Sequence, residues 1–426
     1  MPKYFGTDGI RGKSPEWLND QMAYNIGYAL GAGLKANKLL VGRDTRQSGE
    51  LLSPALIQGA LDSDVEVINL GVVSTPMLAY LTTTEKCFGA MITASHNPYS
   101  DNGIKIILNG EKSSEAQEDV LETYLFQNKD FEIKEELRIN KEILNTYLEA
   151  IETLNFPKTK LDIILDSAHG SLSNWAYKIL SKYANIHKTI GDRPDGLNIN
   201  KNVGSTHIEA LVSSTPKGMI GFAFDGDGDR LICVDEEGNI VTGDQILAIA
   251  AEHFNHKNIV FTQMLNPGIK SRLLQLGISS LETSVGDKYV TSALNEHQYL
   301  IGGENSGHLI FKNMWGLGDG IISALVILRI LSETKSTLHK LSQKFQAYPE
   351  KLINFKNINK NVIVEEDFKE LFKKASSEII LDGKVLLRPS GTESLVRLYA
   401  SHPNPAILNK FIEDASQLFE SYGGYL

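Results

Sequence analysis

The sequence predicts an α/β protein with three successive α/β domains and a smaller C-terminal α+β domain. Its 426 residues exceed what one hydrophobic core organises, because domains usually run to roughly 100 to 200 residues. A short apolar strand followed by a helical pattern begins near residues 38, 161 and 259, and the pattern changes after Pro349. We therefore expect domains over residues 1–152, 153–253, 254–348 and 349–426.

In the first domain, apolar residues four positions apart predict an amphipathic helix: Leu18, Met22, Ile26, Leu30 and Leu34. The patterns that follow predict a strand over 38–41, a helix over about 49–61, and strands over 65–68 and 88–93. Ser95 then stands just past the carboxyl end of a strand, where open α/β sheets usually bind ligands.

The later domains repeat this order. Residues 128–160, rich in Lys, Glu and Asn, predict a helix that leads out of the first domain. The second domain is expected to contain strands over 161–166 and 219–224 and a helix from about Ser171. The third domain is expected to contain a strand over 259–261, a helix after Pro267 and an amphipathic helix over 319–331. The C-terminal domain is expected to contain strands over 352–355, 385–387 and 395–398 and helices over 367–375 and from Pro405.

Composition favours a soluble cytoplasmic protein. The chain is 42% hydrophobic and 22% charged, with a net charge of −10, so nothing general attracts nucleic acid or an anionic membrane. An anionic substrate would have to be held by local Arg and Lys residues. Cys87 and Cys233 lie among apolar residues and predict buried free thiols. No N-terminal h-region and no apolar run of about 18 residues is present.

Ser95 lies in the polar run Thr93-Ala94-Ser95-His96-Asn97-Pro98. A serine is a weak nucleophile that becomes useful in phosphoryl transfer when a cation neutralises the transferring group. His96 can donate a hydrogen bond, and Lys105 is close enough in sequence to reach a phosphoryl oxygen. An ordinary polar turn would look the same.

Asp225, Asp227 and Asp229 place three carboxylates within five residues, separated by two glycines that let the backbone wrap around one ion. These oxygen ligands suit Mg²⁺, which keeps positions for water or phosphate. Arg230 follows and can hold a phosphate through its planar guanidinium group. An EF-hand is disfavoured because Arg230 occupies the position of the turn glycine. An Asp-Gly hairpin turn remains possible.

Arg388-Pro389-Ser390-Gly391-Thr392-Glu393, with Arg397 beyond it, is a candidate phosphate cradle of guanidinium groups, hydroxyls and a glycine N–H. A plain turn between two strands is the alternative.

A second candidate loop, Gly303 to His308, lies between two apolar strands, Tyr299 to Ile301 and Leu309 to Phe311. If this loop stays extended, Glu304 and Ser306 point the same way and suit adjacent sugar hydroxyls; a hairpin tip is the alternative. Arg11, between glycines, is expected to face the site. Lys288 is either a general acid or base, or a surface charge.

Taken in order, these segments resemble the α-D-phosphohexomutase superfamily from end to end. Five motifs carry the resemblance: Lys3 to Gly12, Thr93 to Pro98, Asp225 to Arg230, Gly303 to His308, and Arg388 to Glu393. The chain departs from the family pattern at His169, Lys288 and Ser394, none of which is a metal ligand or the nucleophile.

The resemblance implies three related α/β domains and a C-terminal domain around a central cleft. Ser95 would carry a phosphoryl group, and Mg²⁺ would be bound by its phosphate and the three aspartates. The other site residues would be Arg11, His96, Lys105, Arg230 and Lys288 in catalysis, and Glu304, Ser306, His308, Arg388, Ser390, Gly391, Thr392 and Arg397 in substrate binding.

The implied reaction passes a phosphoryl group from Ser95 to a sugar phosphate through a 1,6-bisphosphate. The N-terminal run Gly6 to Gly12 favours glucosamine phosphates, on the route to UDP-N-acetylglucosamine and the cell wall, over glucose or mannose phosphates. A homodimer is compatible with this reading. A metal-binding sensor without turnover and a phosphatase are the alternatives from other classes.

Overall fold

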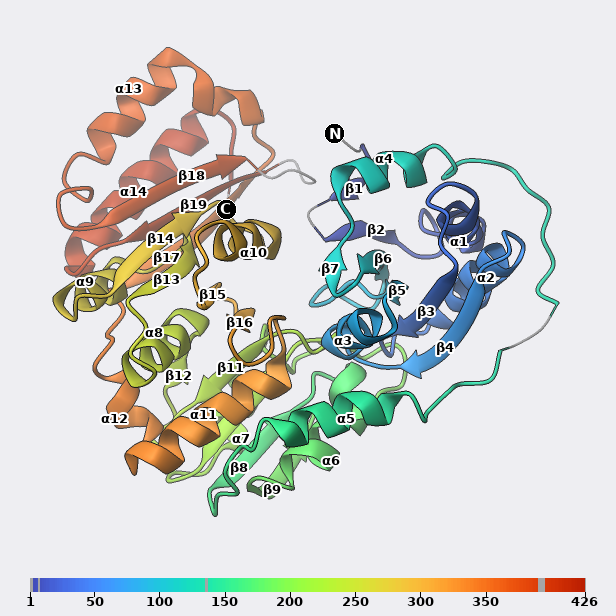
Figure 1. Ribbon diagram of the computed structural model, residues 1–426. Helices are drawn as coiled ribbons and strands as arrows, with labels where there is room; N and C mark the ends of the chain where they lie inside the picture. Colours follow the sequence, from blue (N-terminus) through green and yellow to red (C-terminus); the bar gives the residue numbers. More distant parts are fainter. Residues whose placement is uncertain (1–2, 7, 135–136, 390–394, 426) are drawn as a thin grey trace. The chain divides into compact units, whose positions relative to one another are not determined.

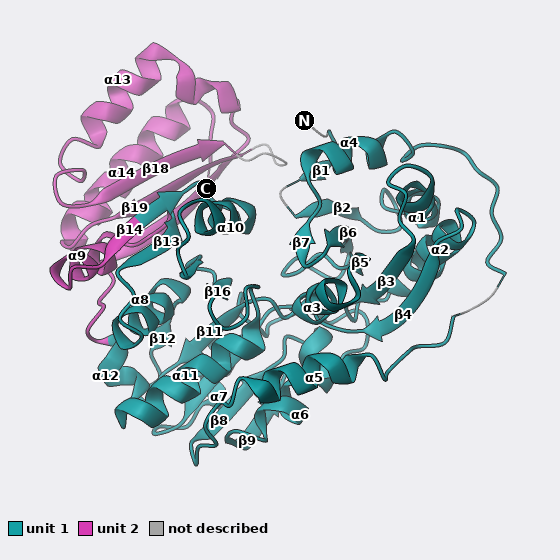
Figure 2. Ribbon diagram, in the orientation of Figure 1, with its two compact units in different colours: residues 1–263, 281–342 teal, residues 264–280, 343–426 magenta. Residues whose placement is uncertain are grey.

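The computed structural model describes residues 3–6, 8–134, 137–389 and 395–425 (Figure 1). The chain divides into two compact units (Figure 2). Unit 1 comprises residues 1–263 and 281–342, and unit 2 comprises residues 264–280 and 343–426. No helix among the described residues is long and apolar enough to cross a membrane.

The first α/β domain has a seven-stranded sheet in the order β1-β2-β6-β5-β3-β4, with β7 paired to β6. Its strands are β1 (Phe5–Gly6), β2 (Gly9–Lys13), β3 (Lys38–Arg43), β4 (Glu66–Val72), β5 (Phe88–Ile92), β6 (Asp101–Leu108) and β7 (Glu111–Lys112). Its helices are α1 (Asp20–Ala32), α2 (Gly49–Leu61), α3 (Thr75–Glu85) and α4 (Glu115–Glu122). Strands β3, β4 and β5 are parallel, whereas β6 runs antiparallel to β5.

Helices α1 and α2 lie side by side (Figure 1), and two glycines allow their close approach. A Cβ at Gly27 would stand 2.0 Å from the Leu56 carbonyl oxygen, and one at Gly59 would stand 2.0 Å from that of Tyr24. Both predicted helices and all three predicted strands of this domain are confirmed. Helix α3 and strand β6 carry no period that we recognised, so they were not predicted.

The second domain has a five-stranded sheet in the order β12-β11-β10-β8-β9. Its elements are α5 (Leu144–Thr153), β8 (Asp162–Asp166), the 3₁₀ helix η1 (Ser171–Asn174), α6 (Ala176–Leu180), β9 (Asn185–Ile190), α7 (Glu209–Ser214), β10 (Ile220–Phe224), β11 (Leu231–Val234) and β12 (Ile240–Val241). The helix predicted from Ser171 is wrong in type at its start, because a 3₁₀ turn precedes α6. Strands β10 and β11 form an antiparallel hairpin.

The third domain has a four-stranded sheet in the order β14-β13-β15-β16. Its elements are α8 (Gly243–His253), β13 (Asn258–Thr262), α9 (Pro267–Gln275), β14 (Ser279–Thr283), α10 (Asp287–Glu296), β15 (Ile301–Gly303), β16 (Leu309–Phe311), α11 (Gly320–Thr334) and α12 (Leu338–Ser342). The strand predicted over 299–301 begins at Ile301, two residues late. The strand at β13 and the helices at α9 and α11 are confirmed.

The C-terminal part of unit 2 contains a three-stranded sheet in the order β17-β19-β18. Its elements are β17 (Glu350–Lys356), the 3₁₀ helix η2 (Lys360–Val364), α13 (Glu366–Ala375), β18 (Lys384–Pro389), β19 (Leu395–Ser401) and α14 (Pro405–Ser421). Phe355 and Phe419 stack in its core with ring centroids 4.0 Å apart. Three α/β sheets and one α+β sheet confirm the predicted fold class.

Candidate active site

The Ser95 loop joins β5 to β6, and its first residues, Thr93 to Ser95, are buried, although the loop is polar. The Ser95 side chain is only 1% exposed, and its φ of 50° lies in the left-handed region that non-glycine residues rarely adopt. The Ser95 N–H donates to Thr93 Oγ1 at 2.9 Å. Such a conformation persists only where surrounding contacts determine it.

Two side chains from different domains supply those contacts. Arg46, 0% exposed, donates from Nη2 to the carbonyl oxygens of Ser95 at 2.9 Å and of Asn97 at 2.8 Å. Asn200 Nδ2 donates to the same two oxygens, at 2.8 and 3.1 Å. Asp44 fixes the guanidinium group through Arg46 Nε at 2.9 Å. The serine hydroxyl is therefore aimed by the backbone of its loop.

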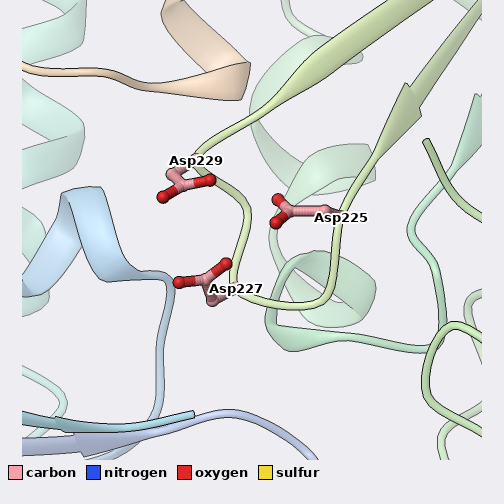
Figure 3. Close-up of side chains that lie close together, drawn as sticks. All are labelled: Asp225, Asp227 and Asp229. Carbon is pink, nitrogen blue, oxygen red and sulfur yellow. The ribbon is translucent and has the colours of Figure 1, made fainter. Parts of the chain in front are cut away.

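The aspartate loop joins β10 to β11, and its three carboxylates face a common space (Figure 3). All three are buried, and their ligand oxygens lie within 4.8 Å of one another. The hairpin-turn alternative describes the backbone correctly, because β10 and β11 are antiparallel. The EF-hand alternative is wrong, since this loop joins the strands β10 and β11, whereas an EF-hand loop joins two helices.

The Ser95 hydroxyl meets this cluster directly. Its Oγ donates to Asp225 Oδ2 at 2.6 Å. Burial, together with the charges of Asp229 and Asp227, raises the pKa of Asp225 well above its usual value. Among the described residues, Asp227 Oδ1 and Asp229 Oδ1 are buried without a hydrogen-bond partner. Unpaired buried carboxylate oxygens are costly, so these residues fit a bound cation.

Cationic side chains surround the cluster. Lys105 Nζ lies 2.7 Å from Asp227 Oδ2 and 4.0 Å from Asp229 Oδ2. Although burial opposes it, the aspartates raise the pKa of Lys105. Arg230 Nε lies 3.9 Å from both Asp225 Oδ2 and Asp229 Oδ1. These cations neutralise the carboxylate charge only in part, because Asp227 Oδ1 and Asp229 Oδ1 still lack a hydrogen-bond donor.

Two histidines lie at the site, and their pKa values are shifted in opposite directions. Burial, followed by the charges of Arg230 and Arg11, lowers the pKa of His96 to about 3, and its Nδ1 lies 3.2 Å from Ser95 Oγ. Burial alone would lower the pKa of His308, but Asp229 and Asp287 outweigh it and raise that pKa to about 9. Near neutral pH, His96 is neutral and His308 is a cation.

The Glu304 loop is a turn between the antiparallel strands β15 and β16, as in the hairpin-tip alternative, so the condition of an extended loop is not met. Gly307 N–H donates to the Glu304 carbonyl at 3.0 Å. The Glu304 side chain is buried and accepts from Gly286 N–H at 3.0 Å, whereas Ser306 is exposed. The argument that the Glu304 and Ser306 side chains point the same way therefore does not apply. Their contacts with a sugar stay a prediction.

Arg11 and Lys288 differ in what they contact. Arg11 forms an ion pair with Asp8, which also binds Lys105 Nζ at 2.9 Å, so Arg11 is connected to the aspartate cluster through Asp8 and Lys105. Lys288 Nζ lies 3.9 Å from Glu115 Oε1 and lines a cavity of about 660 Å³ that Lys105, Asp229 and His308 also line.

In unit 2, Arg388 and Arg397 stand directly opposite each other on β18 and β19. Both side chains are half-buried, and directly opposed residues of an antiparallel pair project from the same face. Arg388 Nη2 also donates to Met264 Sδ at 3.7 Å. Ser390, Gly391 and Thr392 lie outside the described residues.

Sequence reasoning missed several residues that touch the site. Thr75, at the start of α3, donates from Oγ1 to Asp227 Oδ2 at 2.6 Å. Arg46, Asn200 and Asp8 were also missed. The repeated pattern of a polar run just past a strand end could have singled out Arg46, which follows β3 as Ser95 follows β5; Asn200 gave no such signal.

Family models match the chain along nearly its whole length. The phosphoglucomutase/phosphomannomutase alpha/beta/alpha domains I, II and III match residues 2–132, 145–238 and 242–348. The C-terminal domain of the same proteins matches residues 340–417. Phosphoglucosamine mutase from Anoxybacillus flavithermus is 41% identical over 99% of this chain and 100% of the relative. That from Bacillus cytotoxicus is 40% identical over 97% of each.

Solved structures share the fold at lower identity. A phosphoglucomutase/phosphomannomutase family protein from Burkholderia thailandensis has a TM-score of 0.79 at 24% identity, over 99% of this chain and 98% of that one. N-acetylphosphoglucosamine mutase from Aspergillus fumigatus, crystallised with GlcNAc-6P and magnesium, has a TM-score of 0.66 at 16% identity, over 99% and 95%.

Proposed function

The chain belongs to the phosphoglucomutase/phosphomannomutase family and groups with its phosphoglucosamine mutases, and from that membership we propose that it interconverts glucosamine 6-phosphate and glucosamine 1-phosphate. Isomerisation of a sugar phosphate needs a site that can both donate and take back a phosphoryl group. One observation carries this proposal: Ser95 Oγ lies 2.6 Å from Asp225, beside two buried carboxylate oxygens without hydrogen-bond partners.

Asp225, Asp227 and Asp229 would hold Mg²⁺ together with an oxygen of phosphoserine 95. Hard oxygen ligands suit this ion, and when bound it would supply neutralising charge for the transferring phosphoryl group. Lys105 and Arg230 stand within 4.0 Å of these carboxylates and would stabilise the same group once it is present.

In the proposed reaction, the bond between Ser95 Oγ and phosphorus breaks as the free sugar oxygen bonds to phosphorus, giving a 1,6-bisphosphate. The other phosphoryl group then returns to Ser95. His96, with Nδ1 3.2 Å from Ser95 Oγ, is placed to exchange a proton with the serine oxygen. Burial of the serine excludes water that would hydrolyse the phosphoserine.

Substrate binding is assigned to residues outside the aspartate cluster. Glu304, Ser306 and His308 would contact the sugar. Arg388 and Arg397, with Ser390, Gly391 and Thr392, would bind the phosphate that is not reacting. Arg388 and Arg397 are paired across β18 and β19, and two guanidinium groups on one face of a strand pair suit the oxygens of a phosphate dianion.

The product class, an amino-sugar 1-phosphate, suits a cytoplasmic step that leads to UDP-N-acetylglucosamine and the cell wall. A small phosphosugar is the proposed partner, and no nucleic acid or membrane partner is proposed. A homodimer remains a prediction for measurement of mass in solution.

The proposal is tested by measuring kcat/KM with Mg²⁺ on glucosamine, glucose and mannose 6-phosphates. We expect isomerisation of all three at unequal rates, with glucosamine 6-phosphate preferred at least about tenfold, the size of a modest pocket discrimination. A preference for glucose or mannose phosphate would assign the chain to the phosphoglucomutase or phosphomannomutase activity. Release of inorganic phosphate without isomer would indicate a phosphatase and contradict the proposal.

A further inference from the structure

Five charged side chains of unit 1 and His308 form a closed loop of contacts, which we call the charge ring. Its members, in order, are Asp8, Lys105, Asp229, His308, Asp287 and Lys112. Lys105 Nζ lies 2.9 Å from Asp8 Oδ2 and 4.0 Å from Asp229 Oδ2. His308 lies 3.5 Å from Asp229 Oδ2 through Nδ1 and 3.8 Å from Asp287 Oδ2 through Nε2. Lys112 Nζ closes the ring, 2.6 Å from Asp287 Oδ2 and paired with Asp8.

The ring joins all three α/β domains. Asp8, Lys105 and Lys112 come from the first domain, Asp229 comes from the second, and Asp287 and His308 come from the third. Only Asp229 belongs to the aspartate cluster, and Lys105 and His308 contact it directly. Among the described residues, Asp8, Lys112 and Asp287 form no hydrogen bond or ion pair with that cluster, and Lys112 is separated from Asp229 by the most contacts along the ring.

Ion pairs, rather than apolar packing, hold the outer half of the ring. Lys105, Lys112, Asp229, Asp287 and His308 all line the cavity of about 660 Å³. Side chains on a cavity wall lack packing atoms on one side. The side chains of Lys112 and Asp287 are 27% and 16% exposed, so their pairing is partly screened but still strong at 2.6 Å.

Asp287 also connects the ring to the predicted sugar loop. It is the first residue of α10, and the preceding Gly286 N–H donates to Glu304 Oε1 at 3.0 Å. The Lys112–Asp287 pair therefore ties the start of α10, and with it Glu304 and His308, to β7 of the first domain.

We infer that Lys112 and Asp287 are positioning residues for phosphoryl transfer, holding Lys105 and His308 against the aspartate cluster and fixing the Glu304 loop on the first domain. This inference rests on the proposed mutase function. Removing Lys112 leaves Asp8 and Asp287 without the cation that lies between them, and removing Asp287 takes a contact from both Lys112 and His308. Asp287→Asn weakens a direct contact of His308, whereas Lys112→Met acts on Lys105 only through Asp8, which pairs with both lysines.

The test compares Lys112→Met, Asp287→Asn and the double variant with Lys312→Met, a lysine that lines the same cavity outside the ring. We expect each single change to lower kcat ~10- to 100-fold, the effect of a small misplacement of reacting groups, with KM within about threefold. The kcat of the double variant should be no lower than that of the less active single variant, because both changes open the same ring. Lys112→Arg should restore most of kcat, and Lys312→Met should match the wild type.

Hydrogen exchange gives a readout that does not depend on substrate. Amides around Gly286 and in the loop from Glu304 to His308 should exchange faster in Lys112→Met, with an unchanged melting temperature. An inactive wild-type protein would contradict the proposed function, and the exchange comparison would still decide the inference. If hydrogen exchange is unchanged, either of two kinetic results would overturn the inference. One is an unchanged kcat, and the other is additive losses of kcat that a lower melting temperature explains.

Discussion

The Ser95 site and the Arg388–Arg397 pair differ in how completely the protein fixes them. Ser95 and the three aspartates are buried, Ser95 Oγ donates directly to Asp225, and Asn200 of the second domain holds the Ser95 carbonyl. The two arginines are half-buried like charges, directly opposed on a two-strand ladder in unit 2. The reacting groups are therefore held in place before substrate arrives, whereas the arginine pair is proposed to bind the phosphate that does not react.

This comparison predicts a division of kinetic effects. Changes at the buried site should lower kcat, because they alter interactions made in the transition state. Changes at the arginine pair should mainly raise KM, because a phosphate that does not react is bound equally before and during transfer.

The largest effect is expected from Ser95→Ala. Removing the phosphoryl carrier should lower kcat at least ~1000-fold, since no second nucleophile is proposed. Ser100→Ala, an exposed serine of the same loop, is the matched control and should retain activity. The measurement is the steady-state rate on glucosamine 6-phosphate. A Ser95→Ala enzyme with more than a tenth of wild-type kcat would remove Ser95 from the reaction.

Metal removal should come next. Chelation should abolish turnover, and added Mg²⁺ should raise the melting temperature of the wild type, because a bound cation relieves repulsion among three buried carboxylates. In Asp227→Asn, the Mg²⁺-dependent shift in melting temperature should disappear, and kcat should fall ~100- to 1000-fold. Asp130→Asn, an exposed acid outside the site, should behave as wild type. Full activity in excess chelator would contradict the metal assignment.

Asn200→Ala tests whether the loop backbone aims the serine. Arg46 donates to the same carbonyl oxygens, so we expect a partial loss, ~10- to 50-fold in kcat with little change in KM. Asn198→Ala is the control, because its amide bonds to Arg193 within its own loop. Kinetic constants measured at saturating Mg²⁺ check this. A change confined to KM would mean that the hydrogen bonds from Arg46 and Asn200 serve substrate binding.

The smallest effect is expected from Arg397→Lys. Lysine keeps the charge but loses the planar two-donor geometry, which costs about one hydrogen bond and should raise KM roughly fivefold with kcat nearly unchanged. Lys351→Met, on the neighbouring strand β17, is the control. A fall in kcat without a change in KM would contradict the proposed division of kinetic effects between the two regions.

Much of the fold was predictable because it depends on local patterns. The four-residue spacing from Leu18 to Leu34 and the apolar run at 161–166 correspond to α1 and β8. Helix α3, whose sequence Thr75–Glu85 contains four threonines, carries no helical signal, since threonine has a low helix propensity. Helix α3 is instead stabilised by packing in the first domain, which local sequence patterns do not reveal.

The candidate site was predictable where its residues are close in sequence. The three aspartates lie within five residues and converge in the structure. Asn200, 105 residues from Ser95, and the Lys112–Asp287 pair meet their partners only through tertiary contacts. The sequence left open whether the Glu304 loop is extended or a hairpin tip, and Gly307, with a φ of 96°, allows the turn.

The most direct test of the central claim is to follow phosphate on Ser95 through one turnover. Peptide mapping of the purified enzyme should find Ser95 phosphorylated, and rapid mixing with glucosamine 6-phosphate should move that phosphoryl group to the sugar as a 1,6-bisphosphate. Recovery of phosphorylated Ser95 at the end of turnover would complete the prediction. An active enzyme without phosphate on Ser95, or loss of the label only as inorganic phosphate, would contradict the account.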